Sequence, residues 1–396
     1  MPSLLYLSLM RFPNEKAHSL QIVQNCEAFT QVGYTVNLWV TGRSTSADFH
    51  AIDPYKFYGV EHSFEIKHIP VIDLMPYTRG FLEKLAFYLV QFTYLLSLVF
   101  MLIKRRDDVF YTRDESTAFL LTLLKPKHKI AYEAHLFKTG SRGKWLQTQV
   151  CKRVGHVIAI TPKLAEDLIA QRAASPNNML VAHDGIRAVR FANLPSRETA
   201  RKRLNCSQDA FVVGFVGRLQ MLNMDKGVGT LIKALRDIPD CVLAIVGGPD
   251  AIAEQYRQQW IAQGSHPENF WYAGSVPPDN VPRYLCAFDV CAMPHPNTPQ
   301  YANYTSPLKL FEYMASGTPI VASDLAGWAD VVRHEDNALL VPPDNIEALS
   351  HTIKRLQTDT ALRTRLGHQA QQDAFAHYTW QARAHSIRTH IERKTS

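Results

Sequence analysis

Short apolar runs alternate along this chain with stretches in which apolar residues recur at helical spacing. Each run predicts a buried strand of a parallel sheet, and each intervening stretch predicts a helix that covers the sheet. The strands predicted in the first half are Leu4–Met10, Thr35–Val40, Val109–Thr112, Lys129–Tyr132, Val157–Ile160 and Met179–Ala182. The helices predicted between them include Leu20–Gln31 and Pro162–Gln171.

A polar stretch follows His183-Asp-Gly-Ile186, and Ser196–Arg203 within it predicts a linker or a docking helix. The alternation of strands and helices then restarts, which predicts two Rossmann-like domains that face a central cleft. The strands predicted in the second half are Val212–Val216, Val242–Val246, Phe270–Ala273, Val290–Met293, Pro319–Ala322 and Ala338–Val341. The helices predicted there are Val228–Leu235, Ala251–Gln263, Val281–Ala287 and Leu308–Ala315, followed by a long helical region from about Ile346 to Lys394.

Leu85–Ile103 carries no charged residue and is followed directly by Lys104, Arg105 and Arg106. A helix over this segment would be about 28 Å long, which is enough to reach across a hydrocarbon core. Spanning would separate the first two strands from their sheet, so two alternatives are left, a buried core helix and a helix in the membrane interface. Aromatic residues on nearly all sides favour the interface: Phe81, Phe87, Tyr88, Phe92, Tyr94 and Phe100. The basic triplet would add about 1 kcal/mol of attraction to an anionic leaflet per charge.

Composition restricts the class of protein. With 396 residues, the chain is longer than one typical domain, which predicts two domains. Its 46% hydrophobic and 20% charged residues are typical of a soluble fold, and the net charge of +7 predicts a basic surface. We expect no nucleic acid partner, because there is no zinc-ligand spacing, arginine-rich arm or aromatic-basic repeat. The cysteines are scattered, which predicts neither disulfides nor a metal site and favours the cytoplasm. Met1–Met10 lacks a basic lead and a cleavage pattern, so we expect a first buried strand and not a signal peptide.

The segment Tyr304–Asp324 predicts a loop, a helix that Gly317 ends, and an apolar strand. Lys309 and Glu312 project from that helix near its start. The unpaired N–H groups and the positive dipole end of a helix start favour an anion, and Lys309 adds a positive charge. The Glu312 carboxylate can accept two ribose hydroxyls, so a nucleoside diphosphate fits this segment.

The motif Ser306-Pro-Leu-Lys-Leu-Phe-Glu-Tyr-Met-Ala-Ser-Gly317 resembles the nucleotide-sugar site of the retaining glycosyltransferases of family 4, which have the two-domain GT-B fold. Glu312 matches the second of two glutamates in the family pattern, and Tyr304 stands in the place of the first. Many family members with the Ser-Pro-Leu-Lys variant also lack the first glutamate, so we interpret the change as a subfamily mark. It leaves the contact to the sugar hydroxyls unassigned.

The resemblance extends over nearly the whole chain and implies its domains and its donor contacts. It implies an acceptor-binding domain at 1–190, onto which a C-terminal helix at about 380–396 packs back, and a nucleotide-sugar-binding domain at 191–379. The donor contacts that it implies are Ser306, Pro307, Leu308, Lys309 and Glu312. Gly248, in a strand-end loop, should border the nucleobase, because glycine permits close backbone approach.

Two cations and a histidine carry the chemistry that the resemblance implies. Arg218 in Gly-Arg-Leu and Lys226 in Asp-Lys-Gly would hold the donor diphosphate, since fixed cations stabilise the charge that gathers on the leaving group. His135 in Tyr132-Glu-Ala-His matches the Glu-x-His position of the family, close to the sugar's reactive side; the alternative is a structural histidine. Lys16 lies where members of the family carry a glycine-rich loop. Two interpretations of this segment are equally compatible with the sequence: Lys16 contacts phosphate or the acceptor, or the segment is a plain turn.

The sequence therefore predicts a retaining, metal-independent hexosyltransferase with a nucleoside-diphosphate sugar as donor, expected to be UDP-linked, and no separate cofactor. The expected acceptor is lipid-anchored, either a polyprenyl-linked glycan or a glycolipid, at the cytoplasmic face of a membrane. A non-catalytic, glycosyltransferase-like partner subunit and a soluble enzyme with a small acceptor are the alternatives. An epimerase leaves the Leu85–Ile103 helix unexplained, and a phosphorylase needs a pyridoxal lysine context that the sequence does not show.

Overall fold

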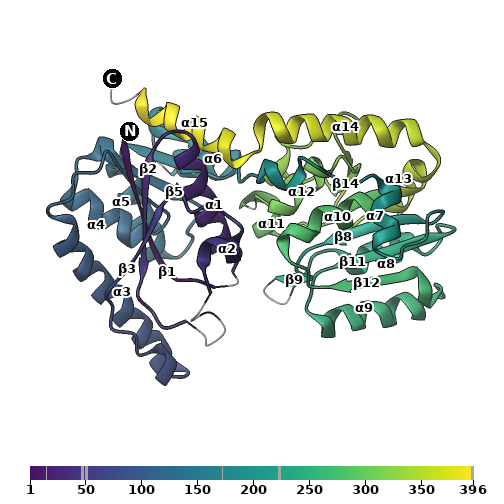
Figure 1. Ribbon diagram of the computed structural model, residues 1–396, viewed down its shortest axis with the longest axis horizontal. Helices are drawn as coiled ribbons and strands as arrows, with labels where there is room; N and C mark the ends of the chain where they lie inside the picture. Colours follow the sequence, from purple (N-terminus) through teal and green to yellow (C-terminus); the bar gives the residue numbers. More distant parts are fainter. Residues whose placement is uncertain are drawn as a thin grey trace. The chain divides into compact units, whose positions relative to one another are not determined.

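The computed structural model describes residues 1–14, 16–45, 49, 52–171, 173–221, 224–304 and 306–393. The chain forms two compact units (Figure 1), Met1–His183 together with Trp380–Ser396, and Asp184–Thr379. The division thus falls between His183 and Asp184, whereas the sequence placed it after residue 190. The C-terminal helix belongs to the first unit.

The first unit is built on a seven-stranded parallel sheet with the order β3-β2-β1-β4-β5-β6-β7. Its strands are β1 (Ser3–Arg11), β2 (Thr35–Thr41), β3 (Glu65–Ile69), β4 (Val109–Thr112), β5 (Ile130–Ala134), β6 (His156–Ala159) and β7 (Met179–Val181). The chain runs outward from β1 in one direction and from β4 in the other. The point between these two strands is therefore the topological switch point, where parallel sheets bind ligands.

Helices pack against this sheet on both faces. They are α1 (Ala17–Gln31), α2 (Pro54–Tyr58), α3 (Phe81–Leu102), α4 (Glu115–Leu124), α5 (Ser141–Arg153), α6 (Pro162–Ala170) and α15 (Trp380–Glu392), with 3-10 turns at Met75–Tyr77, Lys127–Lys129 and Pro176–Asn178. Helix α15 packs against α1, and Figure 1 shows the two together. Arg388 of α15 donates to the Val32 carbonyl and lies over the Tyr34 ring.

The second unit contains a six-stranded parallel sheet with the order β12-β11-β8-β13-β14-β15. Its strands are β8 (Phe211–Val216), β11 (Cys241–Val246), β12 (Phe270–Gly274), β13 (Val290–Met293), β14 (Ile320–Ser323) and β15 (Leu339–Val341), and a separate antiparallel pair joins β9 (Gln220–Met221) to β10 (Met224–Asp225). Its helices are α7 (Arg197–Arg203), α8 (Val228–Leu235), α9 (Asp250–Ala262), α10 (Val281–Ala287), α11 (Pro299–Tyr304), α12 (Leu308–Ser316), α13 (Ile346–Thr358) and α14 (Thr360–His377). Further 3-10 turns occur at Ala188–Phe191, Pro267–Asn269, Pro278–Asn280 and Ala326–Trp328.

Two layers of buried side chains hold this second sheet. Residues of α8, α9 and α13 fill one face, and residues of α10, α12 and α14 fill the other. Fully burying one Leu or Ile side chain contributes about 1.5–3 kcal/mol, so the two apolar layers fix the sheet and the loops at its ends. The α/β class with parallel sheets is confirmed in both units.

The predicted strands are all present, with ends that differ by one or two residues. Strand β3 was missed, because Glu65–Ile69 is an edge strand in which Ile69 alone is buried and no apolar run marks it. Ser196–Arg203 is a docking helix and not a free linker. Ser196 caps α7, and the buried Arg201 pairs with Asp289 at 2.6 Å.

The apolar helix α3 is buried on one side only. Every fourth residue forms its buried stripe, where it packs on α4 and β3: Ala86, Val90, Tyr94, Leu98 and Leu102. The opposite face is apolar and exposed: Phe81, Leu82, Leu85, Tyr88, Phe92, Leu96, Phe100 and Ile103. Among the described residues, α3 is the one helix that is long and apolar enough to cross a membrane, and 28% of its most apolar 18-residue stretch is buried. Helix α3 thus packs on the sheet by one stripe, as a core helix would, and keeps an exposed apolar face on its opposite side.

Candidate functional site

Three cations of the second unit converge at loops that follow its sheet strands. Arg218 follows β8, Lys226 immediately precedes the α8 start, and Lys309 lies in the first turn of α12. Burial, followed by repulsion from Lys309 and Arg218, lowers the pKa of Lys226 to about 8. The geometry agrees, because Arg218 and Lys309 line the same cavity and a Cβ on Gly217 would lie 3.6 Å from Lys309 Cγ.

Glycines allow the loops around these cations to approach each other. A Cβ on Gly247 would lie 2.0 Å from the Gly217 carbonyl oxygen, and one on Gly227 would lie 1.7 Å from the Pro294 carbonyl oxygen. Both residues also have positive φ angles, +137° and +88°, which side chains disfavour. The loops that carry Arg218 and Lys226 therefore depend on glycine at these positions.

A cavity of about 410 Å³ lies beside this cluster. Arg218, Lys309 and the predicted base-contacting Gly248 line it, together with Gly217 and Ser275. The volume is within the range of small-ligand sites. The structure thus brings together three of the predicted donor residues around one hollow.

Glu312 also belongs to this cluster. Its carboxylate accepts a hydrogen bond from the Lys309 ammonium at 2.6 Å, and the Lys309 and Glu312 side chains are 36% and 15% exposed.

Arg190 is a neighbour of Glu312 that the sequence analysis missed. Burial lowers the pKa of its guanidinium, while Asp279, at 2.8 Å, and Glu312 raise it. Only the fold could identify Arg190, since no motif contains it.

The helix start at α12 is open. Pro307 precedes the first helical residue Leu308, and no side chain of the described residues caps this end. The hydroxyl of Ser306 is buried and accepts a hydrogen bond from the Asp184 N–H at 3.0 Å, which anchors the segment. The start of α12 therefore keeps the unpaired N–H groups and positive dipole end that bind anions.

The start of α8 differs from that of α12. Asp225 accepts hydrogen bonds from the N–H groups of Val228 and Gly229 at 3.0 and 2.9 Å, and from the Tyr256 hydroxyl at 2.7 Å. A carboxylate thus occupies this helix end. Of these two helix starts, α12 is the one available to a phosphate.

The predicted histidine lies in the first unit within a buried network. His135 Nε2 and the Tyr111 hydroxyl both contact the Glu133 carboxylate, and Arg383 of α15 pairs with it at 2.9 Å. Burial alone would raise the pKa of Glu133, but Arg383 and His135 outweigh it and hold the pKa well below its usual range. Burial and the nearby Arg113 lower the pKa of His135 to about 4, against the opposing effect of Glu133.

His135 is consequently neutral near pH 7. Its Nε2–H donates to Glu133, which leaves Nδ1 as an acceptor. Sequence analysis identified His135 but missed Glu133 and Arg383 as its supports. The Glu-x-His spacing was a signal for Glu133, whereas Arg383 is far away in the chain.

Lys16 lies in the first unit, just before α1, and is exposed. Its N–H donates to Asn14 Oδ1 at 2.8 Å. Its charge contributes to lowering the pKa of His18 to about 4, after burial and Arg113. Lys16 thus neighbours His18 in the first unit, whereas Arg218, Lys226 and Lys309 belong to the second unit.

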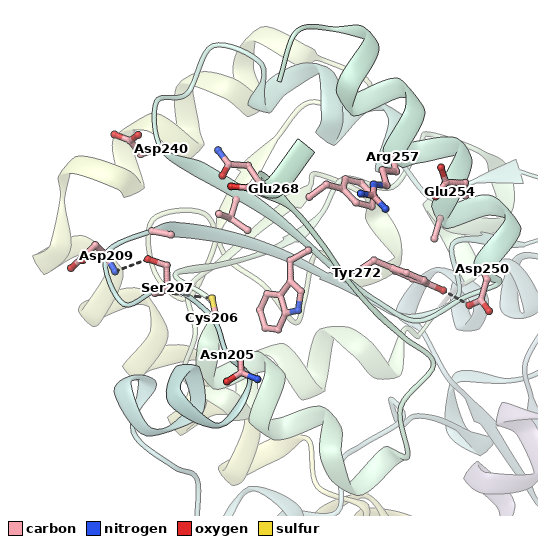
Figure 2. A pocket seen from close by; sticks show the side chains of 16 residues that line it. Asn205, Cys206, Ser207, Asp209, Asp240, Asp250, Glu254, Arg257, Glu268 and Tyr272 are labelled. Atoms are coloured by element: carbon pink, nitrogen blue, oxygen red, sulfur yellow. Dashed lines mark hydrogen bonds between the residues drawn. The ribbon is translucent and has the colours of Figure 1, made fainter. Parts of the chain in front are cut away.

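A larger hollow of about 1090 Å³ lies along the edge strand β12 of the second unit (Figure 2). Its charged lining residues are mainly acidic: Asp209, Asp240, Asp250, Glu254 and Glu268, with Arg257 as the basic one. Figure 2 shows the Tyr272 hydroxyl directed at Asp250, to which it donates. A hollow with this charge repels a diphosphate, so its greater size does not make it the nucleotide site.

Within the described ranges, no group of three or more His, Cys, Asp or Glu side chains is arranged to hold a metal ion. The six cysteines are free thiols.

Comparisons with known proteins connect the second unit to one family. Residues 210–359 match the family model of the glycosyl transferases group 1. The D-inositol 3-phosphate glycosyltransferase of Streptomyces bingchenggensis is 28% identical over 232 residues, which cover 56% of this chain and 49% of that protein. The chain thus spans about half the length of this curated relative.

Solved structures match the fold over the full chain. Sucrose-phosphate synthase from Thermosynechococcus elongatus superposes with a TM-score of 0.75 at 20% identity, covering 99% of each chain. HepE of Anabaena, solved in complex with UDP and glucose, gives a TM-score of 0.69 at 17% identity and covers 98% of this chain and 99% of its own. These likenesses confirm the GT-B fold. Residues 210–359 therefore match the glycosyl transferases group 1 in a chain of GT-B fold, which agrees with the predicted resemblance to glycosyltransferase family 4.

Proposed function

We propose that the protein is a retaining glycosyltransferase that transfers a hexose from a UDP-sugar to an acceptor hydroxyl. The observation that carries the proposal is the convergence of Arg218, Lys226 and Lys309 beside the uncapped start of α12. A donor diphosphate is the ligand that this concentration of positive charge fits. The UDP and glucose bound to HepE support a uridine nucleotide as the donor.

The three cations act on the leaving group. As the bond between the sugar C1 and the phosphate oxygen breaks, the electron pair goes to that oxygen, and Arg218, Lys226 and Lys309 stabilise the resulting negative charge. The acceptor hydroxyl attacks C1 from the face that the phosphate leaves, and its proton passes to the departing phosphate oxygen. The configuration at C1 is then kept, and the positive side chains take the role of a metal.

We assign Glu312 to the ribose hydroxyls, Gly248 to the nucleobase, and the open helix start at Ser306, Pro307 and Leu308 to the diphosphate. His135 is assigned to the transferred sugar, where its neutral imidazole exchanges hydrogen bonds. Glu133 and Arg383 act through His135, because they fix its tautomer and its ring orientation.

The proposed acceptor is a lipid-anchored molecule at the cytoplasmic face of a membrane. Support comes from the exposed apolar face of α3, where Phe81, Phe92 and Phe100 are 75%, 64% and 70% exposed. Lys104 and Arg106, directly after this helix, are exposed cations, which suit anionic lipid headgroups. Arg105 pairs with Asp107 at 2.8 Å and lies over the Trp39 ring, so its charge is partly neutralised within the protein. Of the predicted basic triplet, Lys104 and Arg106 are therefore the stronger candidates for headgroup contact.

The experiment that tests this function is a screen of nucleotide sugars, read out as sugar hydrolysis and as thermal stabilisation, and repeated with membrane lipid extract as acceptor. We expect UDP and a UDP-sugar to stabilise the protein, and the lipid extract to increase turnover. Absence of any nucleotide effect would instead indicate the non-catalytic partner subunit. Efficient transfer to a small soluble acceptor, such as the inositol phosphate in the name of the Streptomyces relative, would contradict the proposal of a lipid-anchored acceptor.

A further inference from the structure

A third and smaller cavity, of about 250 Å³, lies in the first unit at the topological switch point. It is formed at the carboxyl ends of β1 and β4 and beside His135, which follows β5. Its polar lining includes His18, Arg113, Asp114, Glu115, His135 and Lys138. Parallel sheets bind ligands at this place, so the cavity is a candidate for the acceptor.

The carboxylates that line the cavity are already bound to internal donors. Asp114 accepts a hydrogen bond from the Leu9 N–H at 2.8 Å. Glu115 accepts one from the Tyr132 hydroxyl at 3.1 Å and lies 3.3 Å from the Lys138 ammonium. Their negative charge is therefore directed into the protein framework.

The Arg113 guanidinium is different. Its one hydrogen bond found in the structure goes to the neutral Gln21 amide oxygen at 3.4 Å, and no ion pair joins it to a carboxylate in the described part of the chain. Its positive charge acts on both histidines of the cavity, because it lowers the pKa of His18 and of His135 after burial has done so. Against the effect of burial, Arg113 also acts to lower the pKa of Asp114 and of Glu133, but no carboxylate of the described residues forms an ion pair with it, so its guanidinium lines the cavity beside two neutral imidazoles.

Helix α1 adds to this positive environment. His18 lies in its first turn, which contains no acidic residue, and no side chain of the described residues caps this helix end. The dipole end of a helix favours an anion at this position. The exposed Lys16 at the same end contributes a further positive charge.

We propose that this cavity binds a phosphate group of the acceptor, with Arg113 as its main charge partner and Lys138 and His18 as hydrogen-bond donors. The inference rests on the proposed function, because it names the chemical class of the acceptor as a phosphorylated molecule. A phosphate has three oxygens for a planar guanidinium fork and for single donors beside it. Phosphate carried by a lipid and phosphate carried by a soluble sugar present the same group.

The test follows the imidazole signals of His18 and His135 by NMR, assigned with His18→Asn and His135→Asn, while sodium phosphate is added to the full-length protein. Bound phosphate should raise the pKa of both histidines. Arg113→Gln should weaken phosphate binding at least about tenfold, the usual loss when a hydrogen bond to a charged group is removed. Arg142→Gln, at an exposed arginine of the same unit outside the cavity, is the matched control and should bind as the wild type.

Two further measurements distinguish lipid-borne from soluble phosphate, and distinguish loss of phosphate binding from loss of folding. Phosphatidylcholine vesicles with phosphatidic acid replace sodium phosphate in one arm, so a response to vesicles alone assigns the phosphate to a lipid. Lys138→Gln tests the same cavity should Arg113→Gln not fold. The inference is overturned when neither probe moves the two histidine signals, or when Arg113→Gln binds phosphate as tightly as the wild type. UDP stabilisation, which depends on the second unit, is measured in parallel; if it persists in that case, the proposed function stands without this subsite.

Discussion

The two units share a parallel sheet with helices on both faces, yet they arrange charge in opposite ways. In the second unit, Lys226, Arg218 and Lys309 gather, and the Glu312 carboxylate contacts Lys309; burial and then repulsion among the cations lower the pKa of Lys226. In the first unit, Glu133 is closed within a buried network and His135 is neutral. The comparison teaches that the same sheet supports different tasks, because the loop residues at its strand ends determine the chemistry.

The largest effect is expected where the buried network of the first unit is opened. Arg383→Met would leave Glu133 as a buried carboxylate without its cation, and the two side chains are 2% and 4% exposed. Breaking a buried pair in this way lowers the free energy of unfolding by about 3–5 kcal/mol. Urea unfolding measures this value, with Arg393→Met, at an exposed arginine next to the same helix, as control. An unchanged midpoint would show that the pair is not formed.

The second effect concerns turnover and depends on the cations of the second unit. Arg218→Ala and Lys226→Ala should each lower kcat by about 100-fold or more, the typical effect of removing a preorganised charge partner. Neither side chain holds the core, so circular dichroism should be unchanged. Lys233→Ala, at an exposed lysine of α8, is the control. Near-native rates in either variant would remove that residue from the diphosphate site.

The third effect sharpens the comparison at the surface of the first unit. Replacing Lys104 and Arg106 by Gln should weaken binding to anionic vesicles by about 2 kcal/mol, since each charge contributes about 1 kcal/mol near an anionic surface. UDP affinity should stay the same, because the nucleotide binds the other unit. Vesicle sedimentation at increasing salt measures the first quantity. Wild-type protein that stays in the supernatant with every lipid mixture would contradict the membrane proposal.

The smallest effect is a pH dependence of UDP binding. The folded pKa of Lys226, about 8, is below that of a free lysine because of burial and then of Lys309 and Arg218. The ammonium is charged below this value, so UDP affinity should fall as the pH rises through it, by up to about tenfold per unit. The free energy of unfolding should change in the opposite direction. It should rise with pH between about 8 and the unfolded pKa of about 10.4, because in this range the unfolded state binds more protons at Lys226 than the folded state does. Lys226→Arg, which stays charged, should abolish the dependence of UDP affinity; calorimetry across this range tests it.

Sequence alone predicted what depends on local pattern. Apolar runs located β8 and β13, and the helical spacing gave α8 and α10 with their bounds. Strand β3 was missed, because an edge strand needs few apolar residues. The segment around Tyr304 was expected to be a loop, and Tyr304 in fact ends α11.

The candidate site was predictable in part for the same reason. Motifs marked Arg218, Lys226 and Lys309, because each lies next to its own glycine or helix signal. Arg113 and Arg383 carried no such signal. Arg113, which follows β4, contacts Gln21 of α1, and Arg383 of α15 pairs with Glu133 of β5. Pairings between residues so far apart in the chain arise only when the fold is formed.

The central claim is that the second unit contains a binding site for a nucleoside diphosphate, formed by its three cations. UDP binding tests this claim most directly. Thermal unfolding of the wild type and of Lys226→Ala is measured with increasing UDP. The account predicts that UDP raises the Tm of the wild type in a concentration-dependent manner, as any ligand specific for the folded state does, and that the variant loses most of this shift. A wild-type Tm that does not respond to UDP, or a variant that responds equally, would contradict the account.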